Sequence, residues 1–585
     1  MERSFFDLTE PQKSIWLTEH YFENTSIGCI PGMLVIQEEV NFDYLEKAVN
    51  LLVKANDNYR TRIALVNNEP KQYFVNYNKF HLEIENVNTL NEAKKLLNHL
   101  SQIPFTLYNS PLFRAKLFRL VNGQGGLLFV AHHLIYDAWT AGLLIDNIMH
   151  YYTSLKNGTP ITLNPMNTTY IDYIQSEKEY NHSQKFEKDK LFWEDTFTDV
   201  PNLATIPYFK NTRSTSTMIE DFSPRSVRTQ FTIPKDIVNS INVFCRQNKV
   251  SIFNFFMAIF SIYIGRISNL DDFVIGTPIL NRSTYKEKCT GGMFISTMPL
   301  KITIPHSCNF INFVTQISKN TVSSFRHQKY PYQKILEYVR AKDSQIPNLY
   351  DILISYQNMR TNTKSSAIPF FSSWEHNGYS ADSLDISICD INDSGSFQIE
   401  YDYQTDKYGK EDISKIHHRI CYMIEQILNR PNIPLENIDI LLPREKQEIL
   451  YKFNDNTVLY PINSTVEVFE RRVSENPNQI AIIHKDQQIS YYELNKRANQ
   501  LAHFLLVHGF EPKSIISVCM NKTIDFIITI LAIQKMGGCY LPIHPDYPLE
   551  RIQYILEDSH SKLITDGKKE IKNSINFSEI DFSAE

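Results

Sequence analysis

The sequence of 585 residues lacks several features that would place it in a broad functional class. It has no cluster of lysine and arginine, and its net charge of −6 argues against a nucleic-acid-binding protein. Its N-terminus has no apolar signal region, and no apolar run is long enough to span a membrane. The eight cysteines form no C-x-x-C pair, so we expect reduced thiols in a cytoplasmic protein.

The composition is that of a globular protein, and the length indicates more than one domain. Hydrophobic residues make up 42% and charged residues 21%. The length exceeds that of one ordinary domain, so two or three domains are expected. The first clear linker signal is the Pro- and Asn-rich stretch at 429–434.

A polar motif follows an apolar run at 126–130, which is typical of a buried strand. The run ends at two adjacent histidines, His132 and His133, and Asp137 follows four residues after the second. Apolar residues at helical spacing then resume. The pattern predicts strand, polar loop and helix, and a loop at a strand end can hold side chains open to a ligand.

These residue types suit acyl transfer. A neutral imidazole takes up a proton near pH 7, because its unperturbed pKa is about 6.5. Adjacent residues of an extended segment point to opposite sides, so only one of the two histidines can face a given cavity. The other must be packed behind it. The alternative interpretation is that both are core histidines with satisfied hydrogen bonds.

The motif His132-His133-x-x-x-Asp137 resembles the HHxxxDG motif of the condensation domains of nonribosomal peptide synthetases, which are chloramphenicol acetyltransferase-like proteins. The resemblance makes His133 the residue that orients or deprotonates the amine, with His132 packed behind it. Ala138 departs from the usual glycine of the motif. The backbone N–H groups of Ala138 and Trp139 are candidates for stabilising an oxyanion.

Two further motifs occur in the family's order before this one. Leu8-Thr9-x-Pro11-Gln12 resembles the first motif, in the variant typical of starter domains that acylate the first amino acid of a lipopeptide. The alternative there is a plain amphipathic helix. The stretch at 58–63 resembles the second motif, which supplies an arginine partner for the motif aspartate. We expect Arg62 to pair with Asp137, with Arg60 as the alternative.

Later segments resemble the fifth and seventh motifs. The stretch at 290–300 resembles the fifth, with Ser296 in place of the usual asparagine. The stretch at 349–358 resembles the seventh and ends in Tyr356 and Asn358. We expect Ser296, Tyr356 and Asn358 to line the substrate tunnel of such a domain.

The resemblance changes after about residue 445. The stretches at 489–495 and 531–543 resemble the first two motifs of adenylation domains. The phosphate-binding loop and the catalytic lysine of that family are absent from the sequence. We therefore expect an incomplete adenylation domain at 446–585 without adenylation activity, after an N-lobe at 1–175 and a C-lobe at 176–445.

The resemblance implies an α/β fold of two lobes in a V shape, plus a partial α/β adenylation subdomain. It also implies amide formation between a donor acyl thioester and the amine of a carrier-bound aminoacyl thioester. The donor would be fatty acyl, delivered by coenzyme A or a carrier from outside the chain, or would come from a synthetase module upstream. Phosphopantetheine would be supplied by carrier-protein partners, and neither a bound cofactor nor a metal is expected.

Two other functions stay open. One is an acyltransferase of the same fold that uses acyl-CoA and a small free acceptor. The other is a truncated synthetase fragment without catalysis. The intact trio of His132, His133 and Asp137 argues against a degenerate domain.

Overall fold

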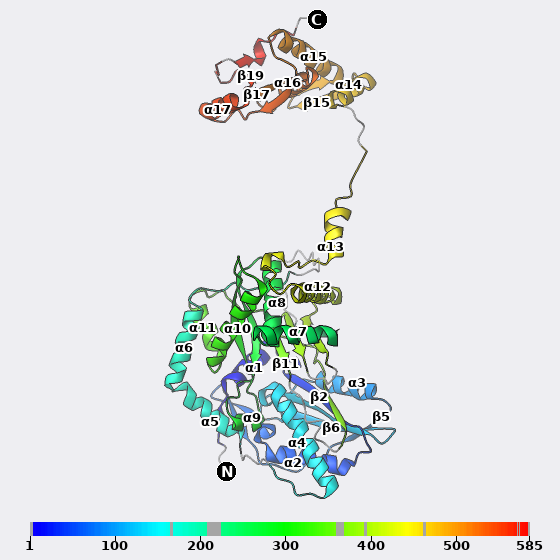
Figure 1. Cartoon of the computed structure of the whole chain (residues 1–585), viewed down its shortest axis with the longest axis vertical. Coiled ribbons are helices and arrows are strands. Elements are labelled where there is room, and N and C mark those ends of the chain that lie inside the picture. The colour runs from blue at the N-terminus through cyan, green and yellow to red at the C-terminus, as the bar shows by residue number, and fades with distance from the viewer. Residues whose placement is uncertain are drawn as a thin grey trace. The chain divides into compact units, whose positions relative to one another are not determined.

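The computed structural model divides the chain into two compact units, Met1–Leu450 and Tyr451–Glu585. Figure 1 shows both units. The structure describes the following residues: 4–163, 168–207, 224–358, 368–390, 395–459, 464–569, 571–572 and 574–582.

The first half of unit 1, the N-lobe, is built on a sheet whose described strands follow the order β12-β2-β7-β6-β5. Their bounds are β2 (Cys29–Ile36), β5 (Ile84–Val87), β6 (Phe113–Leu120), β7 (Gly125–His132) and β12 (Phe370–Trp374). A second sheet has the order β1-β4-β3, formed by β1 (Phe6–Asp7), β3 (Thr61–Val66) and β4 (Glu69–Phe74).

Strand β7 reads as a continuous apolar run because both faces of its sheet are covered. All eight of its residues are buried. Leu127 and Phe129 pack in one core cluster with residues of α2 (Phe42–Ala55) and α4 (Ala138–Asn157). Leu128 and Val130 pack on the other face with residues of α3 (Leu90–Ser101). The strand therefore delivers the polar motif at its end on a rigid support.

The C-lobe follows α5 (Tyr170–Asn181) and α6 (Gln184–Thr196). Its described strands form a sheet in the order β10-β9-β11-β13-β14-β8. They are β8 (Ser226–Ile233), β9 (Asp272–Ile279), β10 (Ser296–Thr303), β11 (Ile352–Gln357), β13 (Leu384–Cys389) and β14 (Phe397–Gln404). The helices are α7 (Lys235–Asn248), α8 (Ile252–Ser268), α9 (Tyr285–Cys289), α10 (Phe310–Arg326), α11 (Tyr332–Arg340) and α12 (Lys410–Asn429).

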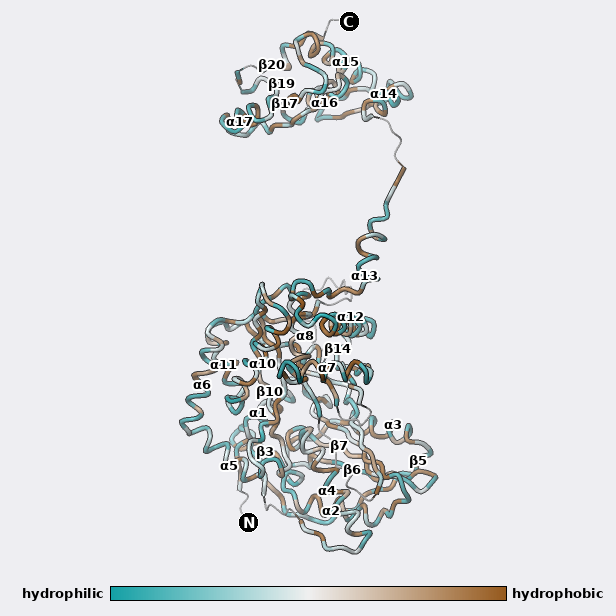
Figure 2. The backbone as a smooth tube through the Cα atoms, viewed as in Figure 1, coloured by the Kyte–Doolittle hydropathy of each residue, from teal (hydrophilic) through white to brown (hydrophobic). Residues whose placement is uncertain are grey.

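Helix α8 is the central helix of the C-lobe core. It begins after Ser251, whose side chain accepts the backbone N–H of Asn254. It is apolar almost all round, and its tube is largely brown in Figure 2. Among the described residues no single helix is long and apolar enough to cross a membrane. Helices α7 and α8 pass that test only together, bent by 101°, and most of α8 is buried in the core.

One strand from the second half of unit 1 belongs to the N-lobe sheet. Strand β12 pairs antiparallel with β2, with Phe370 opposite Ile36 and Trp374 opposite Gly32. The two lobes therefore share a sheet within unit 1. No local pattern in the sequence indicates that β12 pairs with β2. The domain boundaries at 175/176 and 445/446 stay predictions.

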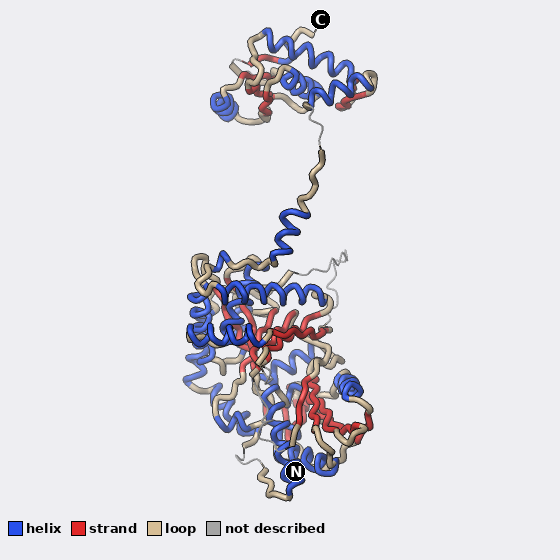
Figure 3. The backbone as a smooth tube through the Cα atoms, turned by 45° about the vertical axis from the view of Figure 1, so that its right-hand side comes forward, coloured by secondary structure: helices blue, strands red, loops and turns tan. Residues whose placement is uncertain are grey.

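Unit 2 has its own core and a parallel sheet in the order β18-β17-β19-β20, with helices and strands distinguished in Figure 3. Its strands are β15 (Ile480–His484), β16 (Gln487–Ser490), β17 (Ile515–Cys519), β18 (Cys539–Pro542), β19 (Lys562–Thr565) and β20 (Ser574–Asn576). Its helices are α14 (Thr465–Glu475), α15 (Tyr491–Val507), α16 (Ile524–Lys535) and α17 (Leu549–Ser559). Short helix α13 (Pro443–Gln447) lies near the end of unit 1, and the π-helix η4 (Glu448–Lys452) continues past the last residue of unit 1, Leu450.

Candidate active site

The two histidines lie where β7 ends and a short 3-10 helix, η2 (His133–Ile135), begins. His132 is the last strand residue and lies opposite Cys29 of β2. The backbone N–H of His133 donates to the carbonyl of Gly28 at 2.8 Å. The change from strand to 3-10 helix therefore turns the two side chains into different surroundings.

His133 has the properties of a neutral base. Burial lowers the pKa of its imidazole below the usual value, although the nearby Asp137 carboxylate opposes this shift. Its Nδ1 is buried and has no hydrogen-bond partner among the described residues. The ring is thus uncharged near pH 7.

His132 is packed away from solvent. Its Nδ1 accepts the backbone N–H of Leu134 at 3.0 Å, and its Nε2 lies 3.1 Å from Oε1 of Glu19. The ring also packs edge-on to Phe105, with ring centres 5.7 Å apart. These partners occupy both ring nitrogens, so His132 supports the turn, and a direct catalytic role for it stays a prediction.

Asp137 holds the two lobes together at the site. Arg282, which follows β9, donates from Nη1 to its Oδ2 at 2.8 Å and from Nη2 to its Oδ1 at 3.1 Å. Both side chains are fully buried. The backbone N–H groups of Thr140 and Phe294 also donate to the carboxylate. Burial alone raises the pKa of Asp137, but Arg282 and these hydrogen bonds outweigh it and lower the pKa below its usual value.

The predicted pairing of Asp137 with Arg62 or Arg60 is wrong. Arg62 donates from Nη1 to the carbonyl of its neighbour Thr61 at 2.8 Å. Arg60 donates to the carbonyls of Val53 and Val75. Both arginines are therefore held by backbone carbonyls near them, and the arginine that reaches Asp137 comes from the other lobe, 145 residues away.

The loop at 290–295, within the stretch that resembles the fifth motif, closes over the start of α4. The Thr140 hydroxyl donates to the carbonyl of Gly292 at 2.8 Å and accepts the N–H of Gly292 at 3.0 Å. Gly292 has φ +147°, and a Cβ there would lie 2.2 Å from the ring of Tyr170. The glycine is therefore required for this close approach.

Ala138 and Trp139, whose backbone N–H groups are the oxyanion candidates, are the first two residues of helix α4. Asp137 caps the helix, and Ala138 is its first residue and is exposed. Trp139 is half-buried, and its ring N–H donates to the carbonyl of Lys288 at 2.8 Å. The side chain of Trp139 therefore joins the lobes, and the role of the two backbone N–H groups stays a prediction.

Two of the three tunnel candidates line a groove of the C-lobe with a volume of about 1110 Å³. Tyr356 also donates from its hydroxyl to Asp390 at 3.0 Å, and Asn358 is exposed. Ser296, the first residue of β10, is half-buried and lies outside the groove lining. The groove also carries apolar and cationic side chains from α7, from the residue that follows it, and from α8 and α10: Arg246, Lys249, Ile252, Phe253, Val322 and Phe325.

Residues that the sequence reasoning missed are Arg282, Thr140 and Glu19. An arginine shortly after an apolar strand is the only signal that the sequence offers for Arg282. Glu19 lies seven residues after Gln12 of the first motif and has no signal of its own in the sequence. No group of three or more His, Cys, Asp or Glu side chains that could hold a metal occurs in the part of the chain that the structure describes.

Comparison with known proteins decides the family. Residues 2–450 match the family model described as condensation domain. The chain belongs to this family. Residues 469–581 of this condensation-domain protein match a second model, described as AMP-binding enzyme. The resemblance predicted from the motifs is therefore confirmed for both parts of the chain.

Two relatives of this condensation-domain protein are synthases of Bacillus subtilis (strain 168). One of the plipastatin synthase proteins is 31% identical over 96% of the chain, and surfactin synthase subunit 1 is 31% identical over 97%. The chain spans only 22% and 16% of their lengths.

Two solved structures share the fold. A four-domain nonribosomal peptide synthetase bound to AMP and glycine is 15% identical, with a TM-score of 0.77 over 99% of this chain and 45% of that one. The starter condensation domain of rhizomide synthetase, solved with C8-CoA and Leu-SNAC, is 17% identical, with a TM-score of 0.64 over 74% of this chain and 97% of that one. The predicted two-lobed α/β fold is confirmed.

Proposed function

We propose that unit 1 forms an amide bond between a donor acyl thioester and the amine of a carrier-bound aminoacyl thioester. The observation that carries this proposal is the position of His133 directly after the buried strand β7, where burial also lowers the pKa of its imidazole. Two surfaces of different lobes meet at this point through Asp137 and Arg282. The arrangement suits a reaction in which two bound substrates must be brought together.

In the proposed reaction the acceptor amine attacks the carbonyl carbon of the donor thioester. A C–N bond forms, the C–S bond breaks, and one amine proton passes through Nε2 of His133 to the released sulfur. Asp137 is unsuited to carry that proton, because Arg282 and backbone N–H groups already occupy its oxygens. It acts by fixing the loop that carries His133.

The partners in this proposal are carrier proteins of synthetase modules, which present the phosphopantetheine thioesters. The donor is an acyl carrier or acyl-CoA, and we place the reaction in the cytoplasm. All eight cysteines are free thiols, which suits a reducing compartment.

The experiment that tests the reaction incubates the protein with acyl donors and an aminoacyl-loaded carrier and detects the amide by intact mass spectrometry. His133→Ala should lower the rate by at least about tenfold, because positioned acid–base groups contribute about 10²–10⁴-fold. His150→Ala, an exposed histidine of α4, is the matched control and should be neutral. Equal rates for both variants would remove His133 from the mechanism. Product from a free amino acid alone would instead favour a small-molecule acyltransferase.

We further propose a fatty acyl donor. The support is the starter-like opening, in which Thr9 caps α1 (Glu10–Tyr21) and Gln12 donates to the carbonyl of Leu134 at 2.8 Å. An alkyl chain in an apolar cleft gains about 0.8 kcal/mol per buried CH₂. The rate with a series of acyl-CoAs should therefore rise with chain length until the cleft is full. Turnover only with a peptidyl carrier would exclude a starter domain and leave the amide chemistry intact.

The groove lined by Tyr356 and Asn358 is the proposed entrance for the donor. Its apolar walls suit an acyl chain, and its two cations suit a phosphate group. Val322→Trp, at a 48% exposed position in the wall, should raise KM for the donor without changing the melting temperature. Val243→Trp on α7, 44% exposed and outside the lining, is the control. An unchanged donor KM in both would place the entrance elsewhere.

A further inference from the structure

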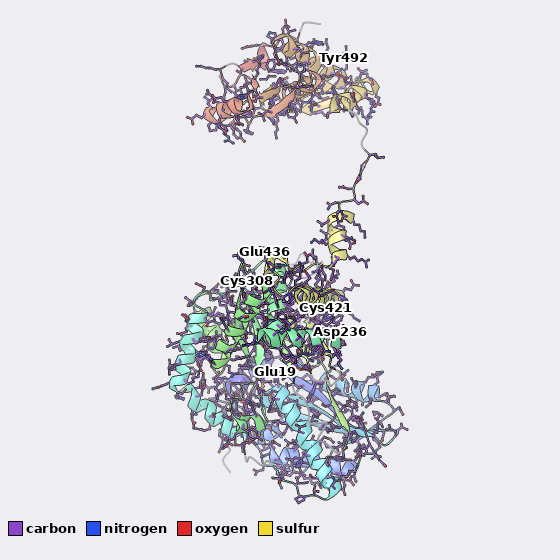
Figure 4. All side chains as sticks on the ribbon, in the orientation of Figure 1. Glu19, Asp236, Cys308, Cys421, Glu436 and Tyr492 are labelled. Atoms are coloured by element: carbon purple, nitrogen blue, oxygen red, sulfur yellow. The ribbon has the colours of Figure 1, made fainter. Side chains whose placement is uncertain are left out.

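Helix α1 packs directly against the turn that carries His133, and its last turn brings a carboxylate to that turn. Figure 4 labels this residue, Glu19, in the middle of unit 1. The side chain of Glu19 is only 10% exposed, and that of its partner His132 only 2%. A carboxylate and an imidazole buried together in this way have a defined hydrogen-bond geometry rather than a solvated one.

The tautomer of His132 follows from its two partners. Nδ1 accepts the backbone N–H of Leu134 at 3.0 Å, and a ring nitrogen that accepts carries no proton. The proton must therefore lie on Nε2, which faces Oε1 of Glu19 at 3.1 Å. The hydrogen bond runs from His132 to Glu19, and the carboxylate favours the one tautomer that leaves Nδ1 free to accept.

His132 accepts the backbone N–H of Leu134, the residue directly after His133. The carbonyl of the same residue, Leu134, accepts Nε2–H of Gln12, also on α1, at 2.8 Å. On the other side, the N–H of His133 donates to the carbonyl of Gly28. The backbone on the Leu134 side of His133 is thus fixed by bonds that depend on α1 and on the tautomer of His132, and the His133 N–H itself is fixed by the carbonyl of Gly28.

Gly28 lies directly against the Glu19–His132 pair. A Cβ at Gly28 would lie 2.1 Å from Oε1 of Glu19 and 2.7 Å from Nε2 of His132. The absence of a side chain at this position is what allows the carboxylate and the imidazole to meet beneath the turn.

We infer that Glu19 is a positioning residue for the proposed reaction: its carboxylate oxygen holds His132 in the Nε2–H tautomer, and His132 in turn sets the backbone that aims His133. This inference rests on the proposed amide-forming function, in which His133 meets the substrates. A displacement of about 1 Å in a reacting group can cost up to about 10²-fold in rate.

Three variants test whether Glu19 acts through its acceptor oxygen or only through packing. Glu19→Met keeps the length of the side chain and removes the acceptor. Glu19→Gln keeps an acceptor oxygen, because the amide can turn its carbonyl toward Nε2–H. Glu23→Met, at a 64% exposed side chain just beyond α1, is the control.

We expect Glu19→Met to lower kcat about tenfold or more with KM changed less than about twofold, whereas Glu19→Gln and the control stay within about threefold of the wild type. A second measurement does not depend on turnover. The ring ¹⁵N shifts of His132, assigned by difference from His132→Gln, should show the Nε2–H tautomer in the wild type and in Glu19→Gln, and should lose it in Glu19→Met.

Wild-type kcat in Glu19→Met would overturn the inference, and so would a rate for Glu19→Gln as low as that of Glu19→Met. If Glu19→Met fails to fold, the wild type and Glu19→Gln still decide, because an Nδ1–H tautomer in either refutes the argument. Absence of amide product from the wild type would refute the proposed function, while the ¹⁵N spectrum would still test the tautomer.

Discussion

Replacing Arg282 by methionine tests whether the lobes are held together by the pair at the site. Both side chains of the Asp137–Arg282 pair are 0% exposed, and they form two hydrogen bonds of 2.8 and 3.1 Å. Removing the arginine leaves the carboxylate buried without its counter-charge. The loss of one member of a buried pair costs about 3–5 kcal/mol in the free energy of unfolding.

That cost converts into a modest but measurable shift in melting temperature. A unit of 450 residues has an unfolding entropy of roughly 0.9 kcal/mol/K, from about 2.1 cal/mol/K per residue. The melting temperature of unit 1 should therefore fall by about 3–5 °C, measured by calorimetry. Arg62→Met is the matched control: Arg62 is half-buried and donates to the adjacent carbonyl, so its loss should cost about 0.5 kcal/mol or less.

The double variant Asp137→Leu, Arg282→Met sharpens the test. Removing both charges at once avoids the unpaired carboxylate, so part of the lost stability should return. The recovery should be incomplete, because the N–H groups of Thr140 and Phe294 then lose their acceptor. A melting temperature of Arg282→Met within about 1 °C of the wild type, or an equal loss in Arg62→Met, would refute this reasoning.

Three further predictions concern pH and the chain between the units. Because burial lowers the pKa of His133, the acid limb of kcat/KM should have an apparent pKa below the usual histidine value of about 6.5; an apparent pKa above 7 would contradict this. The lowered pKa of Asp137 gives stability that is present above its unfolded pKa of about 3.9 and is lost as pH falls below that value. Urea midpoints should thus fall more steeply below about pH 4 in the wild type than in Asp137→Asn, and parallel curves would disprove the linkage. Chymotrypsin should cut first near Phe453 and Leu459, which are 71% and 96% exposed, giving two stable fragments on a gel; initial cleavage inside unit 1 would count against the two units.

The sequence by itself determined the local features of the site. The apolar run before His132 predicted a buried strand, and β7 is that strand, buried along its whole length. The spacing after Asp137 predicted a helix, and Asp137 caps α4 as its side chain accepts the N–H of Thr140. These features depend on residues within one turn or one strand of each other, so periodicity and capping are enough to find them.

Only the tertiary structure decided which groups meet across long stretches of chain. Arg282 reaches Asp137 from 145 residues away, and Glu19 reaches His132 from 113 residues away. Strand β12 crosses from the second half of unit 1 into the sheet of the first. The motif resemblance favoured Arg62 or Arg60 as the partner of Asp137, which was wrong. The physical reason is that a buried charge needs the partner with the right geometry in space, and the packing of two lobes, rather than the order of residues, brings that partner into place.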